Sequence, residues 1–220
     1  METINQRVEE ILAKMTLREK IGQLNQPQTP LPHQAEKIKE MVRRGEIGSI
    51  LMAVGATAGN DPQGAISVDF YNELQRIAVE ESPSGIPIIF GRDVIHGHRT
   101  VLPIPLGMAA SFNFDLIEEC YRDIAEEAMN DSIHWTFTPM LDLARDPRWG
   151  RIIEGAGEDP LVGASMAKAV VRGVQGDDLT ARDSMLACAK HYVGYGAAEG
   201  GRDYHRAEIS DYSLYNYYLP

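Results

Sequence analysis

Short apolar segments alternate along this chain with segments of helical periodicity, and this alternation restricts the possible folds more than any other feature of the sequence. Apolar strands that alternate with helices form a parallel sheet with right-handed crossovers, so the sequence predicts an α/β fold. The predicted strands cover residues 47–53, 86–91, 134–139 and 185–190, and the predicted helices cover 68–81, 116–130, 160–175 and 210–219.

Further helices are predicted ahead of the first strand. Apolar residues recur at helical spacing from Ile4 to Met15, which indicates an amphipathic opening helix. Thr16 and Glu19 have the spacing of a capping box that begins a second helix. A third helix is expected over 34–44, with Gly45 just past its end. The N-terminal part of the chain is therefore predicted to be helical.

Long connections follow the predicted strands, and their position favours a (β/α) barrel over a doubly wound sheet. Loops at the C-terminal ends of strands are where barrel enzymes build their sites. No G-x-G-x-x-G stretch follows the first strand, so the dinucleotide-binding alternative lacks its phosphate-binding loop. A complete eight-stranded barrel takes about 250 residues. We therefore predict a partial TIM-like barrel, with about four βα units and N-terminal helices, as a single domain over residues 1–220.

The composition restricts partners and compartment. The net charge of −11 argues against nucleic acid or an anionic membrane as the main partner. Cys120 and Cys188 lie in apolar or helical patterns, so we expect two small buried residues rather than a disulfide. The N-terminus resembles no signal peptide and no apolar run is long enough to span a bilayer, which together predict a cytoplasmic protein.

Polar side chains gather after the second, third and fourth predicted strands. Acidic groups alternate there with cations, and two tryptophans lie nearby. Carboxylates accept hydrogen bonds from hydroxyls, cations donate them, and aromatic rings stack on sugar faces, so this set suits a polyhydroxylated ligand. The residues are Asp93, His96, His98, Trp135, Asp142, Arg145, Asp146, Arg148, Trp149, Arg151, Glu154, Glu158, Lys190, His191, Arg202 and Asp203.

Structural explanations stay open for several of these residues. Asp146, Arg148 and Arg151 could pair with one another and cap the loop that follows. His96 and His98 are a weak metal signal, since no third ligand stands at a suitable spacing, and we predict no metal site. His134 begins a strand and is expected to be structural.

Lys190 keeps a second chemistry open. A lysine at a strand end in a closed pocket could form a Schiff base, so a lyase remains an alternative on residue chemistry alone.

Several stretches of the sequence resemble the N-terminal domain of family 3 glycoside hydrolases, within their β-glucosidase and β-xylosidase branch. The resemblance runs in order from about Met15 to the last residue. The stretches are "MTLREKIGQL", "GIPIIFGRDVIHG", "RTVLPIPLGMAASF", "HWTFTPMLDLARDPRWGR", "EGAGEDP", "ACAKHYVGYGAAEGGRDY" and "YLP".

The resemblance implies a sugar pocket and a reaction. Asp93, Arg151, Lys190 and His191 match the family's contacts to the sugar at the cleavage point. The implied reaction is retaining exo-hydrolysis of a terminal β-linked glucose or xylose from a glycoside or oligosaccharide, without a cofactor. Relatives are often periplasmic or secreted.

The departures from the family pattern are specific. A branch that cleaves N-acetylglucosaminides carries a histidine where this chain has Tyr195, which favours a β-glucosidase. Ser132 stands where glycine is usual, and Arg92 and His98 stand at positions that are often aromatic.

The two catalytic carboxyl groups of the family are expected beyond Pro220, so we predict none within this chain. Retaining glycosidases place a nucleophile and an acid/base about 5–5.5 Å apart. Asp211 in "SDY" lies at a predicted helix start, and we interpret it as a capping residue. We therefore expect the chain alone to be inactive, and the missing half of the barrel or self-association to complete it. The alternative is a non-catalytic half-barrel that binds sugar weakly or has no function alone.

Overall fold

The structure is a computed structural model that describes residues 3–30, 32–52 and 68–220. Its residues group into two compact units, Met1–Arg92 and Asp93–Pro220. The single domain expected over 1–220 stays a prediction, and each unit is described by itself.

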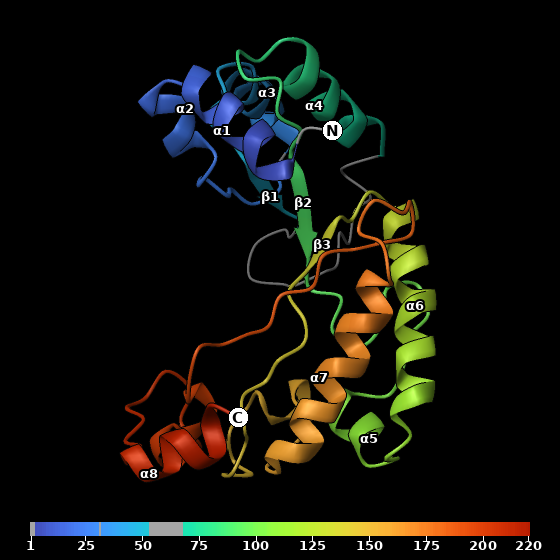
Figure 1. Cartoon of the computed structure of the whole chain (residues 1–220), viewed down its shortest axis with the longest axis vertical. Coiled ribbons are helices and arrows are strands. Elements are labelled where there is room, and N and C mark those ends of the chain that lie inside the picture. The colour runs from blue at the N-terminus through green and yellow to red at the C-terminus, as the bar shows by residue number, and fades with distance from the viewer. Residues whose placement is uncertain (1–2, 31, 53–67) are drawn as a thin grey trace. The chain divides into compact units, whose positions relative to one another are not determined.

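The described residues of the first unit form four α-helices, a short 3-10 helix and a parallel strand pair (Figure 1). Its core is a cluster of buried aliphatic and aromatic side chains around Ile50, Leu74, Ile77 and Phe90. Strands β1 and β2 are parallel, with Ile50 opposite Phe90, as apolar strands joined by a helix require. The elements are α1 (Ile4–Lys14), α2 (Leu17–Gly22), α3 (Ala35–Arg43), β1 (Ser49–Leu51), α4 (Val68–Glu80) and β2 (Ile89–Arg92). The last residue of the first predicted strand lies outside the described residues.

The predicted helix boundaries of this unit follow from local chemistry. Thr16 and Glu19 form the expected capping box at the start of α2, each side chain hydrogen-bonded to the other's backbone N–H. Gly45 has φ +69°, the left-handed geometry expected just past α3. Helix α1 forms as predicted, yet no residue of it is buried. Its apolar face therefore contributes nothing to this core.

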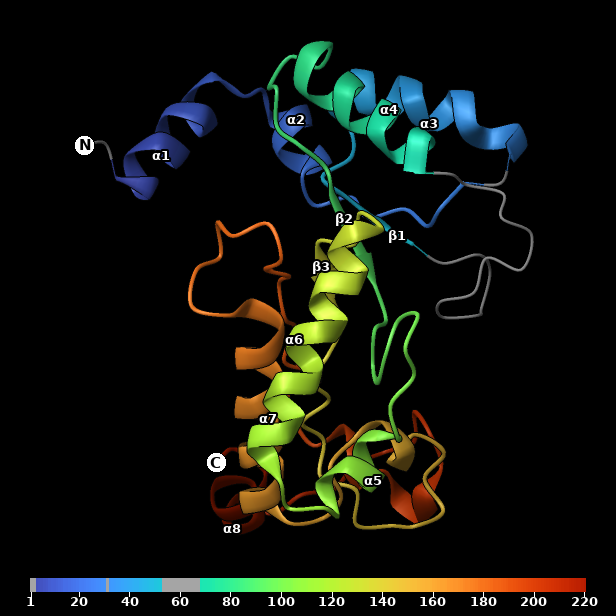
Figure 2. The ribbon, with the colours of Figure 1, turned by 90° about the vertical axis from the view of Figure 1, so that its right-hand side faces the viewer.

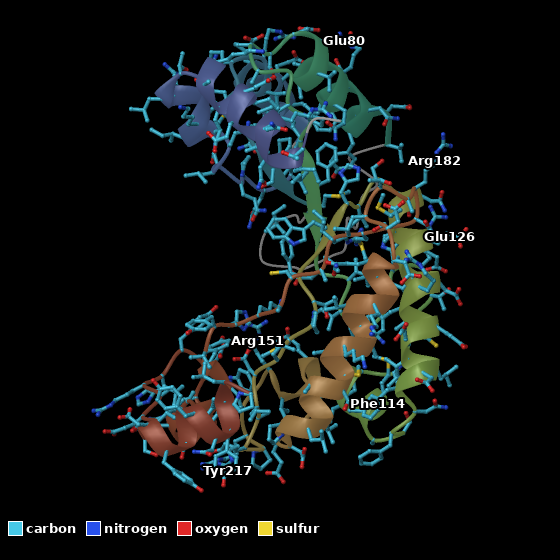
Figure 3. All side chains as sticks on the ribbon, viewed as in Figure 1. Glu80, Phe114, Glu126, Arg151, Arg182 and Tyr217 are labelled. Carbon is cyan, nitrogen blue, oxygen red and sulfur yellow. The ribbon has the colours of Figure 1, made fainter. Side chains whose placement is uncertain are left out.

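The second unit is built on two long helices, α6 (Phe114–Asn130) and α7 (Pro160–Gln175), which lie side by side in both views of the ribbon (Figures 1 and 2). Gly173 on α7 permits this contact, because a Cβ there would lie 2.6 Å from the Tyr121 Cβ of α6. The labelled Glu126 of α6 points away from α7 (Figure 3). The other elements are α5 (Pro105–Ala109), β3 (Trp135–Thr136) and α8 (Asp211–Ser213), which continues as a π-helix over Leu214–Tyr218.

The capping residue predicted for α7 is confirmed, whereas the one predicted for α8 is wrong. The Asp159 side chain accepts from the N–H groups of Leu161 and Val162, and Pro160 is the first residue of α7, as predicted. At α8 the capping side chain is Ser210, which accepts from Ser213 N–H. The interpretation of Asp211 as the capping residue was wrong by one position.

The fourth predicted strand, 185–190, is not a continuous strand. Its backbone still follows segment 134–139 in parallel, with hydrogen bonds from Leu186 N–H to His134 O and from Cys188 N–H to Thr138 O. Pro139 has no N–H to donate, which interrupts the ladder and leaves β3 only two residues long.

The two cysteines are free, as predicted, but both are half-buried rather than buried.

Candidate active site

Lys190 and Asp93 form the first contact of the site. Asp93 directly follows β2 in the chain, and Lys190 ends the segment that runs beside 134–139. The Lys190 Nζ donates to Asp93 Oδ1 at 3.1 Å, and only 14% of the lysine side chain is exposed. The Asp93 side chain is also mostly buried, so its carboxylate fixes the position of the ammonium group.

His191 makes a different contact although it is the next residue. Its backbone N–H donates to Asp142 Oδ2 at 2.9 Å, and its ring Nδ1 lies 2.8 Å from the same oxygen. The Asp142 side chain is fully buried. The Lys190–His191 peptide bond is cis.

Arg151 is held by a carboxylate on its own turn. Its Nε and Nη2 donate to the two carboxylate oxygens of Glu154 at 2.6 and 2.7 Å. This bidentate hydrogen bonding raises the pKa of Arg151 above its usual range, so the group is a permanent cation. Its guanidinium also lies over the Tyr195 ring, 5.4 Å from the ring centroid.

Tyr195 contacts both His191 and Arg151. Its ring lies edge-on to His191 and to Trp149, with centroids 4.8 and 5.2 Å apart. Its hydroxyl donates to Asp203 Oδ1 at 2.6 Å. Burial, followed by this hydrogen bond, raises the pKa of Tyr195 to about 12, so the phenol is neutral and remains a donor.

All four predicted sugar-binding residues thus lie in one unit, in two groups of contacts. Asp93 contacts Lys190, while His191 and Arg151 both contact Tyr195. Lys190 and His191 line a hollow of about 180 Å³. The sugar-binding roles of these residues stay predictions.

The carboxylates behind the site are the part that sequence reasoning missed. Asp142, Glu154 and Asp203 were recognised as polar residues at strand ends, but not as partners of His191, Arg151 and Tyr195. For Glu154 the spacing of three residues from Arg151 on a helical turn was a usable signal. For Asp142 and Asp203 the sequence contains no such signal, because their contacts depend on how loops that are distant in the chain meet.

Trp149 corrects another expectation. It is only 1% exposed and its indole N–H donates to Asp203, so it is not available to stack on a sugar. Trp135 packs edge-on against Phe137 with ring centroids 4.8 Å apart.

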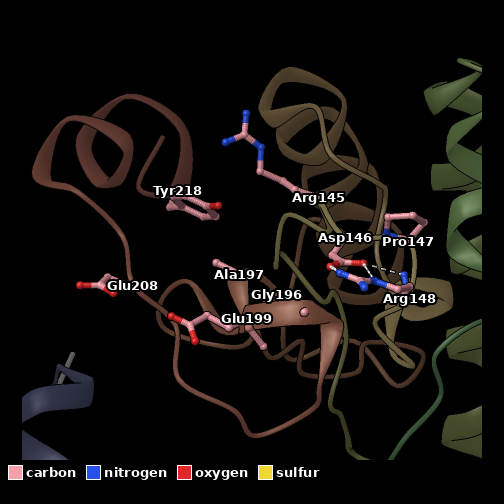
Figure 4. Close-up of a pocket in the computed structure, with 11 residues that line it drawn as sticks. Arg145, Asp146, Pro147, Arg148, Gly196, Ala197, Glu199, Glu208 and Tyr218 are labelled. Carbon is pink, nitrogen blue, oxygen red and sulfur yellow. Dashed lines mark hydrogen bonds and ion pairs between the residues drawn. The ribbon is translucent and has the colours of Figure 1, made fainter.

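The structural explanations for neighbouring charges hold in part. Arg148 pairs with Asp146 as expected, and this hydrogen bonding lowers the pKa of Asp146 to about 2. Both lie at a second hollow of about 530 Å³, which Glu199 of the segment 196–200 also lines (Figure 4). Arg151 departs from that explanation, since it pairs with Glu154 instead.

The two histidines that follow β2 are each hydrogen-bonded through a ring nitrogen to another group of the protein. His96 Nδ1 lies 2.8 Å from the Leu102 carbonyl, and His98 Nε2 lies 2.7 Å from Asp131 Oδ2. Across residues 3–30, 32–52 and 68–220, no cluster of three metal-ligating side chains occurs. His134 is half-buried, and burial lowers its pKa.

Comparison with known families identifies the chain. Residues 16–220 match the family model of the glycosyl hydrolase family 3 N-terminal domain. The chain belongs to glycosyl hydrolase family 3. The resemblance stated from the motifs is confirmed.

Family 3 relatives include a periplasmic β-glucosidase of Salmonella typhimurium, 38% identical over 213 residues. That alignment covers 97% of this chain but 26% of the relative. A lysosomal β-glucosidase of Dictyostelium discoideum is 33% identical over 97% of this chain and 28% of its own length. A relative from Formosa agariphila that is named as a β-xylosidase is 32% identical over 99% of this chain and 30% of its own length. The chain thus spans less than a third of these family 3 relatives.

Solved family 3 structures confirm the fold class. A β-glucosidase from Listeria innocua in complex with glucose has a TM-score of 0.83 and 36% identity, over 100% of this chain and 31% of that one. The α/β, partial TIM-like architecture is therefore that of the family 3 N-terminal domain.

In the part of the chain that the structure describes, no helix has the length and apolar character needed to cross a membrane.

Proposed function

We propose that this chain supplies the sugar-binding half of the active site of a retaining β-glucosidase, which removes a terminal β-linked glucose or xylose. Two groups of contacts within one unit carry the proposal: the ion pair of Lys190 with Asp93, and the contacts of the Tyr195 ring with His191 and Arg151. They meet where Lys190 and His191 are neighbours in the chain and line the same hollow. The named relatives support the substrate class, since they are β-glucosidases and a β-xylosidase.

The chemistry of the set fits a sugar better than a reacting carbonyl. Within the described residues, the Lys190 ammonium group donates one N–H to Asp93, which leaves two further N–H donors. Arg151 is a fixed cation beside an aromatic ring. Hydroxyl groups of one sugar ring can accept from these cations and donate to Asp93, which recognises a polyhydroxylated ligand without any cofactor.

Glucose binding tests the sugar site directly. We expect glucose to shift the amide NMR signals of the loop at residues 190–195 in the ¹⁵N-labelled full chain. Lys190→Ala should weaken this binding by about tenfold or more, because it removes a charge-assisted donor. Lys168→Ala on α7 is the matched control and should bind as the parent chain does. Equal binding by Lys190→Ala and the parent would contradict the proposed sugar contact.

Turnover tests a second part of the proposal, that this chain alone does not hydrolyse a glycoside. The expected result with an aryl β-glucoside is no release of the aryl alcohol by this chain alone. Clear hydrolysis by the purified chain would overturn that part, and would require a carboxyl pair among residues 1–220.

The lyase alternative requires Lys190 as a neutral amine. Its Nζ lies 3.1 Å from Asp93 Oδ1 in an ion pair, a geometry that does not favour this chemistry. Borohydride treatment in the presence of an aldehyde substrate should leave Lys190 unmodified. A reduced adduct at Lys190 would restore the alternative.

The cytoplasmic location expected from the sequence stays a prediction, and the name of the Salmonella relative points to the periplasm for that protein. Fractionation of cells that express this chain from its own gene would decide between the two compartments.

A further inference from the structure

Asp142 is a buried acid that the proposed sugar contacts do not use. Its side chain has no exposed surface, and its Oδ2 accepts from the backbone N–H of His191 and lies 2.8 Å from the ring Nδ1 of the same residue. Among the described residues its Oδ1 is buried without any hydrogen-bond partner. A carboxylate buried in this way lowers stability unless its charge is compensated. Its contacts with His191 indicate what this residue does.

The contacts determine which nitrogen of His191 carries the proton. An ionised carboxylate only accepts hydrogen bonds, so Nδ1, 2.8 Å from Oδ2, must be the donor. The neutral imidazole then has its lone pair on Nε2. Nε2 has no hydrogen-bond partner within the described part of the chain, and the ring lines the same hollow as Lys190.

We propose that Asp142 is a positioning residue that fixes His191 as the Nδ1–H tautomer, so that Nε2 accepts a hydrogen bond from a sugar hydroxyl next to the Lys190 donor. This inference rests on the proposed sugar-binding function. Lys190 offers donors and His191 offers an acceptor, which together match two neighbouring hydroxyls, one accepting and one donating. Asp142 itself does not touch the sugar.

The tautomer can be measured without any ligand. Long-range ¹H–¹⁵N spectra of the labelled full chain, recorded at alkaline pH where imidazoles are neutral, distinguish protonated from unprotonated ring nitrogens. His191→Gln identifies the signals of His191. The expected result is a protonated Nδ1 and an unprotonated Nε2. A neutral His191 protonated on Nε2 would overturn the inference.

Variants separate positioning from a purely structural role. In Asp142→Ala the proton should move to Nε2, because the Nδ1 acceptor is gone. In Asp142→Asn the amide oxygen can replace Oδ2 and accept both N–H groups, so the parent tautomer should return. Asp146→Ala, which removes a carboxylate from the same loop without contact to His191, is the matched control and should leave the tautomer unchanged. Should Asp142→Ala not fold, the parent chain and Asp142→Asn still decide the question.

Glucose titration links the tautomer to recognition. Asp142→Ala should bind glucose about tenfold more weakly, the effect of one lost hydrogen bond, while Asp142→Asn stays near the parent value. A changed tautomer with unchanged glucose binding would overturn this inference while leaving the proposed function intact. A parent chain with the expected tautomer that binds no glucose would contradict the proposed function instead.

Discussion

At the scale of single residues, carboxylates hold His191, Arg151 and Tyr195 in position at the candidate site. Asp142 fixes His191, Glu154 fixes Arg151, and Asp203 holds the hydroxyl of Tyr195. Each of these contacts uses a charged acceptor, which makes a shorter and stronger hydrogen bond than a neutral one. The orientation of the site is therefore sensitive to residues that do not themselves contact a ligand.

Ser132 carries a backbone conformation that suits glycine. Its φ is +65°, at a position where the family resemblance leads one to expect glycine. We predict that Ser132→Gly raises the free energy of unfolding by about 0.5–1 kcal/mol, because it relieves left-handed strain. Urea denaturation measures this. Ser165→Gly, inside α7, is the control and should lower stability by a similar amount. A loss of stability in Ser132→Gly would contradict the prediction.

His134 makes the stability of the chain depend on pH. Burial lowers its folded-state pKa below the ordinary value, so the unfolded chain binds the proton more readily as the pH falls through about 6.5. This group therefore destabilises the native state on acidification from neutral pH. We predict that His134→Gln loses less stability than the parent chain between neutral and mildly acidic pH. Denaturation midpoints at both pH values measure the difference, and identical losses would contradict it.

The sequence could predict where the site residues stand, but not what orients them. Lys190 and Asp93 were recognisable because both follow apolar segments, and the carboxyl ends of parallel strands share one edge of a sheet. The contact between Asp142 and His191 spans 49 positions and depends on how a loop folds back, which no local pattern encodes. The prediction that Trp149 stacks on a sugar was wrong for the same reason, since the sequence does not show that its ring is buried.

At the scale of elements, helices were more predictable than strands. Capping side chains act within three or four residues, so the starts of α2 and α7 could be read directly from the sequence. Strand length depends on a partner far along the chain. Pro139 removes a donor from the third segment, which shortens β3 and leaves 185–190 paired only intermittently.

Gly173 sets the distance between α6 and α7. An added Cβ would stand 2.6 Å from both the Tyr121 Cβ and the backbone oxygen of Glu118, neither of which can move aside easily. We predict that Gly173→Ala lowers the free energy of unfolding by about 1–3 kcal/mol, the usual range for overpacking. Chemical denaturation provides the measurement.

Gly163 on the same helix is the matched control. Its added Cβ would meet Leu143 Cδ2 at 3.7 Å, an ordinary contact. Gly163→Ala should therefore raise stability by about 0.5–1 kcal/mol, because alanine loses less conformational freedom in a helix than glycine. Equal effects of the two substitutions would show that close packing at Gly173 is not the cause.

At the scale of the whole molecule, the single-domain prediction has a direct test. Both tryptophans, Trp135 and Trp149, lie in the unit Asp93–Pro220, so tryptophan fluorescence reports on that unit alone. Far-UV circular dichroism also reports on the helices α1 to α4 of the first unit. If residues 1–220 form one cooperative domain, the two probes give the same denaturation midpoint. Distinct midpoints would make the two units independent in folding.

The last parallel segment has a further property that matters for the molecule in solution. Leu186, Cys188 and Lys190 direct their backbone N–H groups to segment 134–139, while alternate residues direct theirs the other way. Two of those outward donors are already used, because Ala187 N–H binds the Gln175 side chain and His191 N–H binds Asp142. A β-strand that paired along this edge would find these two N–H donors already occupied, which weakens pairing at those two positions.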